Sequence, residues 1–220
     1  MTLGLLLGGG GSVGIAWESG VLAGLADACG FDASACEVII GTSAGAAVGA
    51  GFALGKDPHD ALDRAANVQL SGIPPLDLEQ GAFAEILQLL MSGEARTPAG
   101  VARVGELAVE AETSLTEDEF VNMFRRGTET DEWPSGVDFR CTTTQCSTGQ
   151  PKVWTKADGI DLARAVASSC AIPGFFPTVS FGGERYMDAM RGRNYHASIL
   201  EGFDLDAVLF VGPKIAVPGV

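Results

Sequence analysis

One serine has the sequence context of a nucleophile. Ser43 is the centre of a G-x-S-x-G pattern, and an apolar, β-branched run, Glu37–Ile40, comes directly before that pattern. A serine at a sharp strand-to-helix turn is exposed and held in a strained backbone, as this chemistry requires. Gly41 and Gly45 fit this geometry because larger side chains two residues from the serine would clash. The N-terminus of the following helix would also favour negative charge at Ser43, so we interpret Ser43 as a candidate nucleophile.

A second glycine cluster follows the apolar run Thr2–Leu7 and matches G-x-G-x-x-G. The glycines of this cluster are Gly9, Gly10, Gly11 and Gly14. In a dinucleotide fold they would receive a pyrophosphate, and an acid about 20 residues on would bind the ribose. Here the second strand ends in the Ser43 turn instead, and Ile15 stands where a phosphate-binding loop needs lysine. We favour a different role, in which the glycine amides stabilise a tetrahedral oxyanion beside Ser43, where one donor contributes about 3–4 kcal/mol. Dinucleotide binding remains the weaker alternative.

A serine nucleophile needs a base, and the sequence offers three candidates. His59 lies in a polar Lys-Asp-Pro-His-Asp stretch that is expected at the surface. His196 comes eight residues after Asp188, a short separation for an acid–histidine pair of a triad. A Ser–Asp dyad without histidine is the other option, and it directs attention to Asp188, which ends a predicted hairpin.

At this point the chain resembles the patatin-like acyl hydrolases. Four segments match in order: the glycine-rich loop, the Ser43 turn, the helix-breaking run Ala167–Pro177, and Asp188, followed by Asn194 at the family's later asparagine. The resemblance implies that Ser43 attacks an ester carbonyl and that Asp188 acts as the base. It also implies that the amides of Gly10 and Gly11 stabilise the oxyanion, with no metal and no cofactor.

Three positions depart from the family pattern. Val13 stands where the family usually has arginine or lysine, which favours neutral esters over anionic phospholipids. Ala189 and Met190 follow Asp188 in place of Gly-Gly or Gly-Ala, and His196 replaces a usual proline. If the position after Asp188 needs positive φ, alanine there is strained by about 1 kcal/mol or more and the base is displaced. This motivates a second alternative, a catalytically degenerate lipid-binding protein of the same fold.

The elements that must position these residues alternate between strands and helices. Short connections between such elements imply a mostly parallel sheet covered on both faces. We therefore expect an α/β protein with the three-layer α/β/α patatin-like fold. The predicted strands are Thr2–Leu7, Glu37–Ile40, Val137–Thr144, Val153–Thr155, Val179–Phe181, Arg185–Met187 and a buried strand at Ala207–Val211. The predicted helices include Val13–Cys29, Ala44–Leu54 and Asp161–Ser169.

Residues 56–135 differ from the rest and are rich in prolines and helical patterns. We predict one domain over residues 1–220, with this segment as a helical insertion or cap. Thr116 and Glu119 form a predicted capping box that opens a helix ending at Gly127. The stretch Glu106–Glu132 is strongly acidic and is expected to present a solvated face.

Composition limits the classes of partner. The chain has 220 residues, 46% of them hydrophobic, and a formal net charge of −14. That charge disfavours nucleic acid and weakens docking on anionic membranes. Five cysteines without a CxxC pattern indicate reduced thiols, and no apolar run approaches the roughly 20 residues of a spanning helix. We expect a cytoplasmic protein that acts on lipids or small esters, with transient contact to membrane or micelle surfaces.

The sequence also predicts the surroundings of two further residues. Glu18 is expected to complement the dipole of the first helix, with a supporting acid near the site as the less favoured interpretation. Trp17 is expected in the core or in a pocket wall. The sequence does not predict an oligomeric state.

Overall fold

A computed structural model describes residues 1–66, 81–190 and 193–213. Seven strands form one sheet in this part of the chain: β1 (Leu3–Leu7), β2 (Val38–Thr42), β3 (Asp138–Gln145), β4 (Pro151–Trp154), β5 (Val179–Phe181), β6 (Glu184–Met187) and β7 (Ala207–Val211). The α-helices are α1 (Gly11–Cys29), α2 (Ala44–Ala53), α3 (Pro58–Ala66), α4 (Gly81–Ser92), α5 (Pro98–Glu110), α6 (Glu117–Thr128) and α7 (Leu162–Ser169). Short 3-10 helices are η1 (Ala33–Ala35), η2 (Glu94–Arg96) and η3 (Lys156–Asp158), and a longer one is η4 (Arg193–Gly202).

The sheet has the order β5-β6-β3-β2-β1-β7, and β4 pairs with β3 beside this path. Strands β7, β1, β2 and β3 are parallel, whereas β4, β5 and β6 form antiparallel pairs. The register places Leu7 opposite Gly41, so the loop after β1 and the turn after β2 leave the same edge of the sheet. Ligands bind at such carboxyl edges of α/β sheets.

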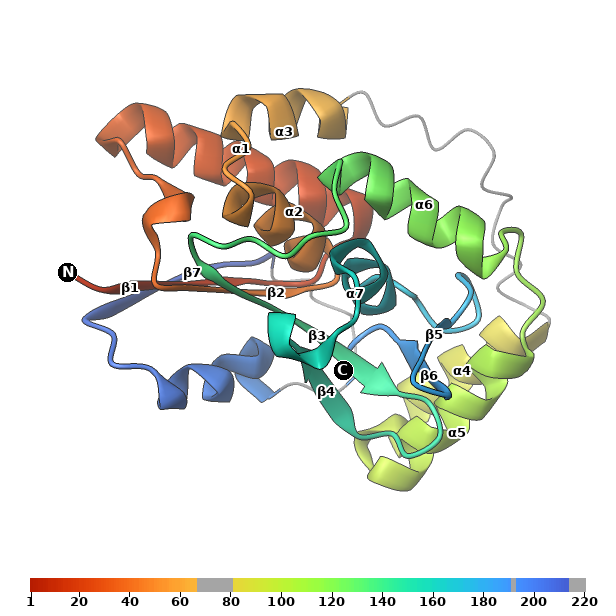
Figure 1. Cartoon of the computed structure of the whole chain (residues 1–220). Coiled ribbons are helices and arrows are strands. Elements are labelled where there is room, and N and C mark those ends of the chain that lie inside the picture. Colours follow the sequence, from red (N-terminus) through yellow and green to blue (C-terminus); the bar gives the residue numbers. More distant parts are fainter. Residues whose placement is uncertain (67–80, 191–192, 214–220) are drawn as a thin grey trace.

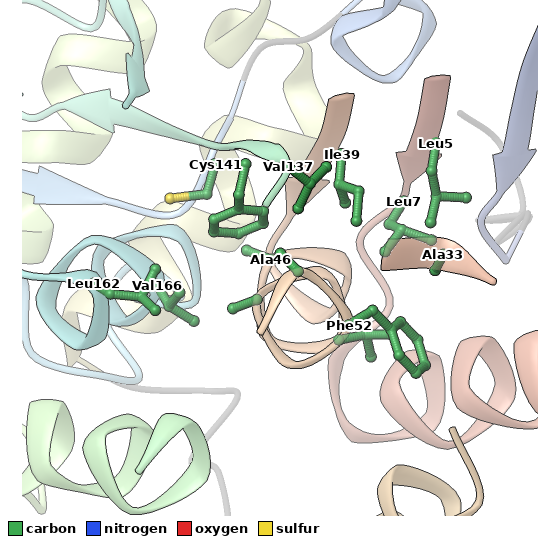
Figure 2. Close-up of a cluster of buried hydrophobic side chains, with 14 of the residues drawn as sticks. Leu5, Leu7, Ala33, Ile39, Ala46, Phe52, Val137, Cys141, Leu162 and Val166 are labelled. Atoms are coloured by element: carbon green, nitrogen blue, oxygen red, sulfur yellow. The ribbon is translucent and has the colours of Figure 1, made fainter. Parts of the chain in front are cut away.

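Helix α2 lies against the sheet at the centre of the main core (Figures 1 and 2). Its small residues allow this close approach: a Cβ at Gly49 would lie only 3.1 Å from Ile39 and 3.2 Å from Leu7. Figure 2 shows Ala46 and Phe52 of α2 among side chains of β1, β2 and α7. The buried side chains of Leu5, Leu7, Ile39, Leu162 and Val166 complete this part of the core.

The opposite face of the sheet is covered by η4 and the segment after it (Figure 1). Leu6, Val38 and Ile40 are buried there against Ala197, Ile199, Leu200, Phe203 and Leu205. Because the sheet is covered on both faces, its central strands are almost entirely apolar. The result is the expected three-layer α/β arrangement around a mostly parallel sheet.

Most of the predicted elements are confirmed, with ends that differ by one or two residues. The capping box is present, since the Thr116 hydroxyl accepts from the Glu119 amide and the Glu119 carboxylate accepts from the Thr116 amide. The prediction of a buried final strand is wrong. Strand β7 lies at the edge of the described sheet, and Val208 and Phe210 are 47% and 43% exposed. Trp17 was also wrongly placed, because its side chain is 45% exposed on α1.

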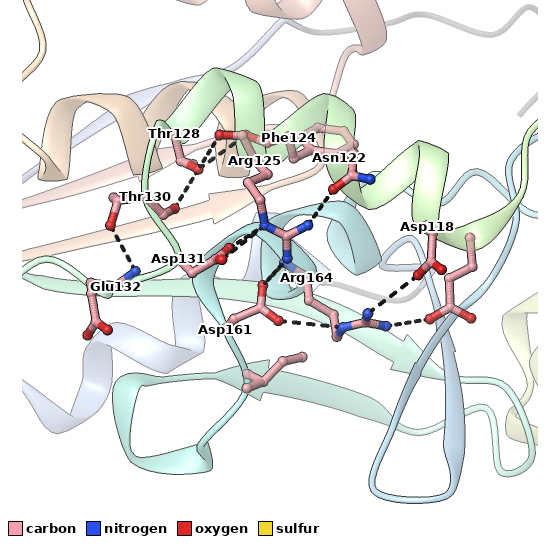
Figure 3. A network of polar contacts seen from close by, with 12 residues as sticks. Asp118, Asn122, Phe124, Arg125, Thr128, Thr130, Asp131, Glu132, Asp161 and Arg164 are labelled. Carbon is pink, nitrogen blue, oxygen red and sulfur yellow. Dashed lines mark hydrogen bonds and ion pairs between the residues drawn. The ribbon is translucent and has the colours of Figure 1, made fainter.

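Helix α6 is fastened to the start of α7 by a network of charges (Figure 3). Arg125 bonds Asp131 at 2.7 Å and lies 3.6 Å from Asp161, while Arg164 pairs with Glu117. Glu117 also accepts from the Ser180 amide at 2.9 Å and from its hydroxyl. The prediction of a solvated acidic face is therefore wrong at Glu117.

The division of the chain into one domain with an insertion at 56–135 stays a prediction, and residues 67–80 of that insertion lie outside the described residues. All five cysteines are free thiols, three of them buried. Within the described residues, no helix is both long and apolar enough to cross a bilayer.

Candidate active site

Ser43 stands between β2 and α2 in a backbone conformation that serine rarely adopts. Its φ is 54° and its ψ is −116°, and its amide donates to the Ser169 hydroxyl at 2.9 Å. A Cβ at Gly41 would lie 2.3 Å from the Gly45 carbonyl oxygen, and one at Gly45 would lie 2.5 Å from the Leu7 carbonyl carbon. Both glycines are therefore required for the close approach of backbones around the turn, as the sequence pattern predicted.

Asp188 follows β6 and reaches the same turn. The Ser43 hydroxyl donates to Oδ2 of Asp188 at 2.7 Å. The carboxylate is oriented from its other side by the Ala189 amide, which donates to Oδ1 at 2.7 Å. The Asp188 amide donates to the Ala171 carbonyl at 2.9 Å, which ties the aspartate to the segment after α7. The structure thus brings together two residues that are 145 positions apart in the chain.

The surroundings of Asp188 change its acidity. Burial raises the pKa of this carboxyl from 3.8 to about 7, although the hydrogen bonds from Ser43 and Ala189 act in the opposite direction. A general base works best when its pKa is close to the operating pH. An ordinary carboxylate would be a weak base toward serine, so the burial of Asp188 supplies the property that a Ser–Asp pair needs.

The glycine-rich loop after β1 passes beside Ser43. A Cβ at Gly9 would lie 3.6 Å from the Ser43 Cβ, and the Gly8 carbonyl accepts from the Gly45 amide at 2.9 Å. The amides of Gly9, Gly10 and Gly11 make no hydrogen bond to any group in the described part of the chain. They are therefore free to bind an anionic oxygen.

Gly14 has a different role from the one expected. Its amide donates to the Gly10 carbonyl at 2.8 Å as part of the first turn of α1, so it is not a free donor for an oxyanion. A Cβ at Gly14 would lie 3.1 Å from the Ala44 Cβ, and one at Gly10 would lie 2.7 Å from the Gly14 Cα. We therefore correct the prediction for Gly14: it allows α1, the loop and α2 to pack closely.

Neither histidine contacts the serine hydroxyl. His59 is an exposed residue of α3 that pairs with Asp27 at 3.0 Å, as its polar context predicted. His196 is buried, and its Nδ1 lies 3.3 Å from the Thr42 hydroxyl, one residue before the nucleophile candidate. The side chain of Asn194 lies outside the described residues.

The concern about Ala189 is not realised. Among the non-glycine residues that the structure describes, Ser43, Glu129 and His196 have positive φ, and Ala189 does not. The next amide, that of Met190, donates to the Thr144 hydroxyl at 3.0 Å. Alanine therefore fits this backbone without the strain that motivated the degenerate alternative.

An apolar pocket of about 370 Å³ opens beside Ser43. Its walls come from α1, α2, α3, α6 and the segment after α7, and include Ile15, Val48, Phe120, Met123, Phe124, Ile172 and Phe176. Phe120 and Phe176 stack with ring centroids 4.6 Å apart. A larger cavity of about 540 Å³ lies around Trp133 at the amino ends of β2 and β3, and none of the candidate site residues lines it.

Two residues of the site were missed or misjudged from the sequence. The Ser169 hydroxyl accepts a hydrogen bond from the Ser43 amide. In the sequence, the only indication of this role was a pair of serines at the end of a predicted helix. Glu18 was expected to complement a helix dipole, but it lies in the middle of α1 and is fully buried. A charged residue on the apolar side of a helical pattern was the signal that could have revealed it.

These features define a class of α/β protein. In this class, a serine turn and a glycine-rich loop with unpaired amides follow neighbouring strands, and both lie beside an apolar pocket. More specifically, the chain belongs to the patatin-like phospholipase family, which its sequence matches over residues 5–200. No curated protein matches the sequence.

One solved structure supports this fold, and a second shows a weaker similarity. The chain is similar to VipD from Legionella pneumophila, with a TM-score of 0.56 and 16% sequence identity over 96% of this chain and 49% of VipD. It is also similar to the type III effector protein ExoU, with a TM-score of 0.43 and 20% identity over 99% of this chain and 49% of that one. The first similarity supports the fold, and this chain spans about half the length of either protein.

Proposed function

We propose that this protein is a serine acyl hydrolase that cleaves lipid or simple carboxylic esters through a Ser43–Asp188 dyad. The observation that carries the proposal is the 2.7 Å hydrogen bond from the Ser43 hydroxyl to Asp188. Membership in the patatin-like phospholipase family supports lipid hydrolysis and argues against dinucleotide binding by the Gly9–Gly14 loop.

In the proposed reaction, the Ser43 oxygen attacks the ester carbonyl while its proton passes to Asp188. The carbonyl oxygen becomes an oxyanion, which the free amides of Gly9, Gly10 and Gly11 would stabilise. The intermediate collapses, the ester C–O bond breaks, and Asp188 returns the proton to the leaving alcohol. A water that loses its proton to Asp188 then hydrolyses the acyl-enzyme, which releases the acid and restores Ser43.

The pocket suggests the acyl group of the substrate. At about 30 Å³ for each water-sized group, the 370 Å³ pocket holds a chain of roughly a dozen methylene-sized groups. Its apolar walls would favour a medium-length acyl chain, since each buried methylene contributes about 0.8 kcal/mol. Val13 is 75% exposed near the start of α1, where family members carry a basic residue, which favours neutral esters.

The predicted insertion at 56–135 has a place in this proposal. Helix α6 supplies Phe120, Met123 and Phe124 to the pocket, so we propose that this part of the insertion caps the acyl chain. Contact with a membrane or micelle surface would be transient, in agreement with the acidic net charge.

The test is hydrolysis of p-nitrophenyl esters from acetate to palmitate at pH 7.5. We expect a maximum at medium chain length, and a loss of at least a thousandfold in kcat for Ser43→Ala and Asp188→Asn. Ser135→Ala and Asp138→Asn, which change the same residue types away from the pocket, serve as matched controls. Equal rates in the wild type and Ser43→Ala would overturn the proposal.

Two further measurements separate the alternatives. A fluorophosphonate should label Ser43 in the active enzyme, whereas a degenerate lipid-binding protein with a displaced base should not react. A rise in melting temperature with NAD would instead favour dinucleotide binding.

A further inference from the structure

Glu18 is a buried acid that the proposed reaction does not use. Its side chain is 0% exposed, and neither carboxyl oxygen has a hydrogen-bond partner in the described part of the chain. A buried polar group without partners lowers stability. A leucine would fill this site without that loss of stability, so packing alone does not explain a carboxyl group here.

Glu18 lies beneath the glycine-rich loop. It follows Gly14 by four residues and therefore shares the helix face that packs against Gly10 and Ala44. The Gly8 amide is close enough to influence the carboxyl, but its hydrogen bond goes to the Val211 carbonyl at 3.0 Å. The Gly8 carbonyl also accepts from the Gly45 amide, which joins the glycine-rich loop to the Ser43 turn at the carboxyl edge of the sheet. Glu18 therefore lies close to the point where these three parts meet.

The surroundings of Glu18 favour its neutral form. Strands β1, β2 and β7 and helix α2 contain no titratable side chain. Helix α3, which also packs on α1, carries His59, paired with Asp27, and the exposed Asp60 and Asp63; the side chain of Arg64 lies outside the described residues. Burial raises the pKa of Glu18 to about 8, although the Gly8 amide acts in the opposite direction.

We propose that Glu18 is a positioning residue that must stay neutral beneath the oxyanion loop, and that its ionisation slows the enzyme in alkaline solution. The proposal rests on the proposed function and adds a proton-linked control to that site. An ionised Glu18 would place a negative charge under the amides that must stabilise an oxyanion. It would also draw the Gly8 amide away from Val211 and so disturb the loop.

The size of the effect follows from the helix geometry. Gly11 and Glu18 are seven residues apart, which is about 10 Å along a helix. At that distance and an effective dielectric constant of about 20, an added charge lowers the rate roughly tenfold. Activity should therefore rise with ionisation of Asp188 near pH 7 and fall again above pH 8.

The experiment is a pH profile of kcat and KM between pH 5.5 and 9.5, with the rate of fluorophosphonate labelling of Ser43 as a second readout. We expect Glu18→Gln to keep the rise near pH 7 and to lose the alkaline fall of kcat, with KM changed less than threefold. Asp27→Asn, an exposed acid on the same helix, should keep the wild-type profile. If Glu18→Gln does not fold, Glu18→Met replaces it with the same expectation.

The outcomes separate the two proposals. An alkaline fall that persists in Glu18→Gln, or a wild-type rate that stays flat above pH 8, overturns the role of Glu18 and leaves the dyad intact. A wild type that neither hydrolyses esters nor reacts with the fluorophosphonate at any pH overturns the proposed function, and the role of Glu18 with it.

Discussion

Two carboxyl groups near the candidate nucleophile have raised pKa values, and burial is the main cause for both. Asp188 keeps one strong partner in the Ser43 hydroxyl, and its pKa is about 7. Glu18 has no partner in the described chain, and its pKa is about 8. Two acids with such values near one site are typical of functional rather than structural carboxyls.

The pKa of Asp188 predicts a dependence of stability on pH. Its value is raised in the folded protein, so the folded state binds the proton more tightly, and the stabilisation is complete below pH 3.8 and lost as the pH rises to about 7. The free energy of unfolding of the wild type should therefore fall relative to that of Asp188→Asn by up to roughly 4 kcal/mol between these limits. Glu18 makes the same pH-dependent contribution to the free energy of unfolding of the wild type and of Asp188→Asn, so it does not affect the difference between them.

Urea unfolding at pH 4, 5.5, 7 and 8 measures this difference. Asp138→Asn, which removes an acid from a surface ion pair with Arg140, serves as the control. A constant difference between the wild type and Asp188→Asn at all four pH values would contradict a raised pKa at Asp188.

At the scale of elements, α6 must stay in place if it is to form a pocket wall. Arg164 links it to α7, because this guanidinium contacts Glu117 and Asp161 and donates to the Ser180 carbonyl at 3.2 Å. The hydrogen bonds from Ser180, the charge of Arg185 and the contact with Arg164 lower the pKa of Glu117, and they outweigh the opposing effect of its burial. The wall of the pocket thus depends on ion pairs as well as on the packing of Phe120.

We predict that Arg164→Met destabilises the protein by about 2 kcal/mol, since it leaves the half-buried Glu117 with fewer partners. This corresponds to a fall of about 6 °C in Tm for a chain of this length. The stabilisation by a carboxylate with a lowered pKa is present above pH 4.5 and lost as the pH falls further, so the difference in Tm should shrink in acid.

Calorimetry of Arg164→Met at pH 7 and pH 3.5 provides the measurement. Arg126→Met removes an exposed arginine from α6 and is expected to change Tm by less than about 2 °C. Similar effects of the two substitutions would refute the role of Arg164 as an anchor.

At the scale of the whole molecule, the net charge of −14 would govern the approach to a lipid surface that the proposed function requires. Negative potential repels anionic lipids over about a Debye length, which is about 10 Å at 0.1 M salt. Neutral lipids and micelles carry no such barrier. In the proposed function, the charge would therefore select among lipid surfaces without involving any residue of the candidate site.

We predict that salt accelerates the hydrolysis of lipids in phosphatidylglycerol vesicles several-fold between 20 and 300 mM NaCl, because screening weakens the repulsion. The rate on phosphatidylcholine vesicles and on a soluble ester should change less than twofold. A rate on anionic vesicles that decreases with salt would show that attraction, and not repulsion, controls docking.

Local patterns in the sequence determined most of the elements and the serine turn. Strands β1 and β2 are short apolar runs, and the conformation of Ser43 needs glycine at positions 41 and 45, so a few neighbouring residues are sufficient to predict them. The order of motifs and the resemblance that they carry also identified the family, which the match over residues 5–200 confirms.

The tertiary structure decided which side chains meet and which are buried. Asp188 and His196 were both candidates for the base, but only folding brings Asp188 to 2.7 Å from a hydroxyl 145 residues earlier in the chain. The exposure of β7 likewise depends on contacts between distant segments. Burial, which sets the pKa values of Glu18 and Asp188, is a sum over all surrounding atoms, and a local pattern does not contain that sum.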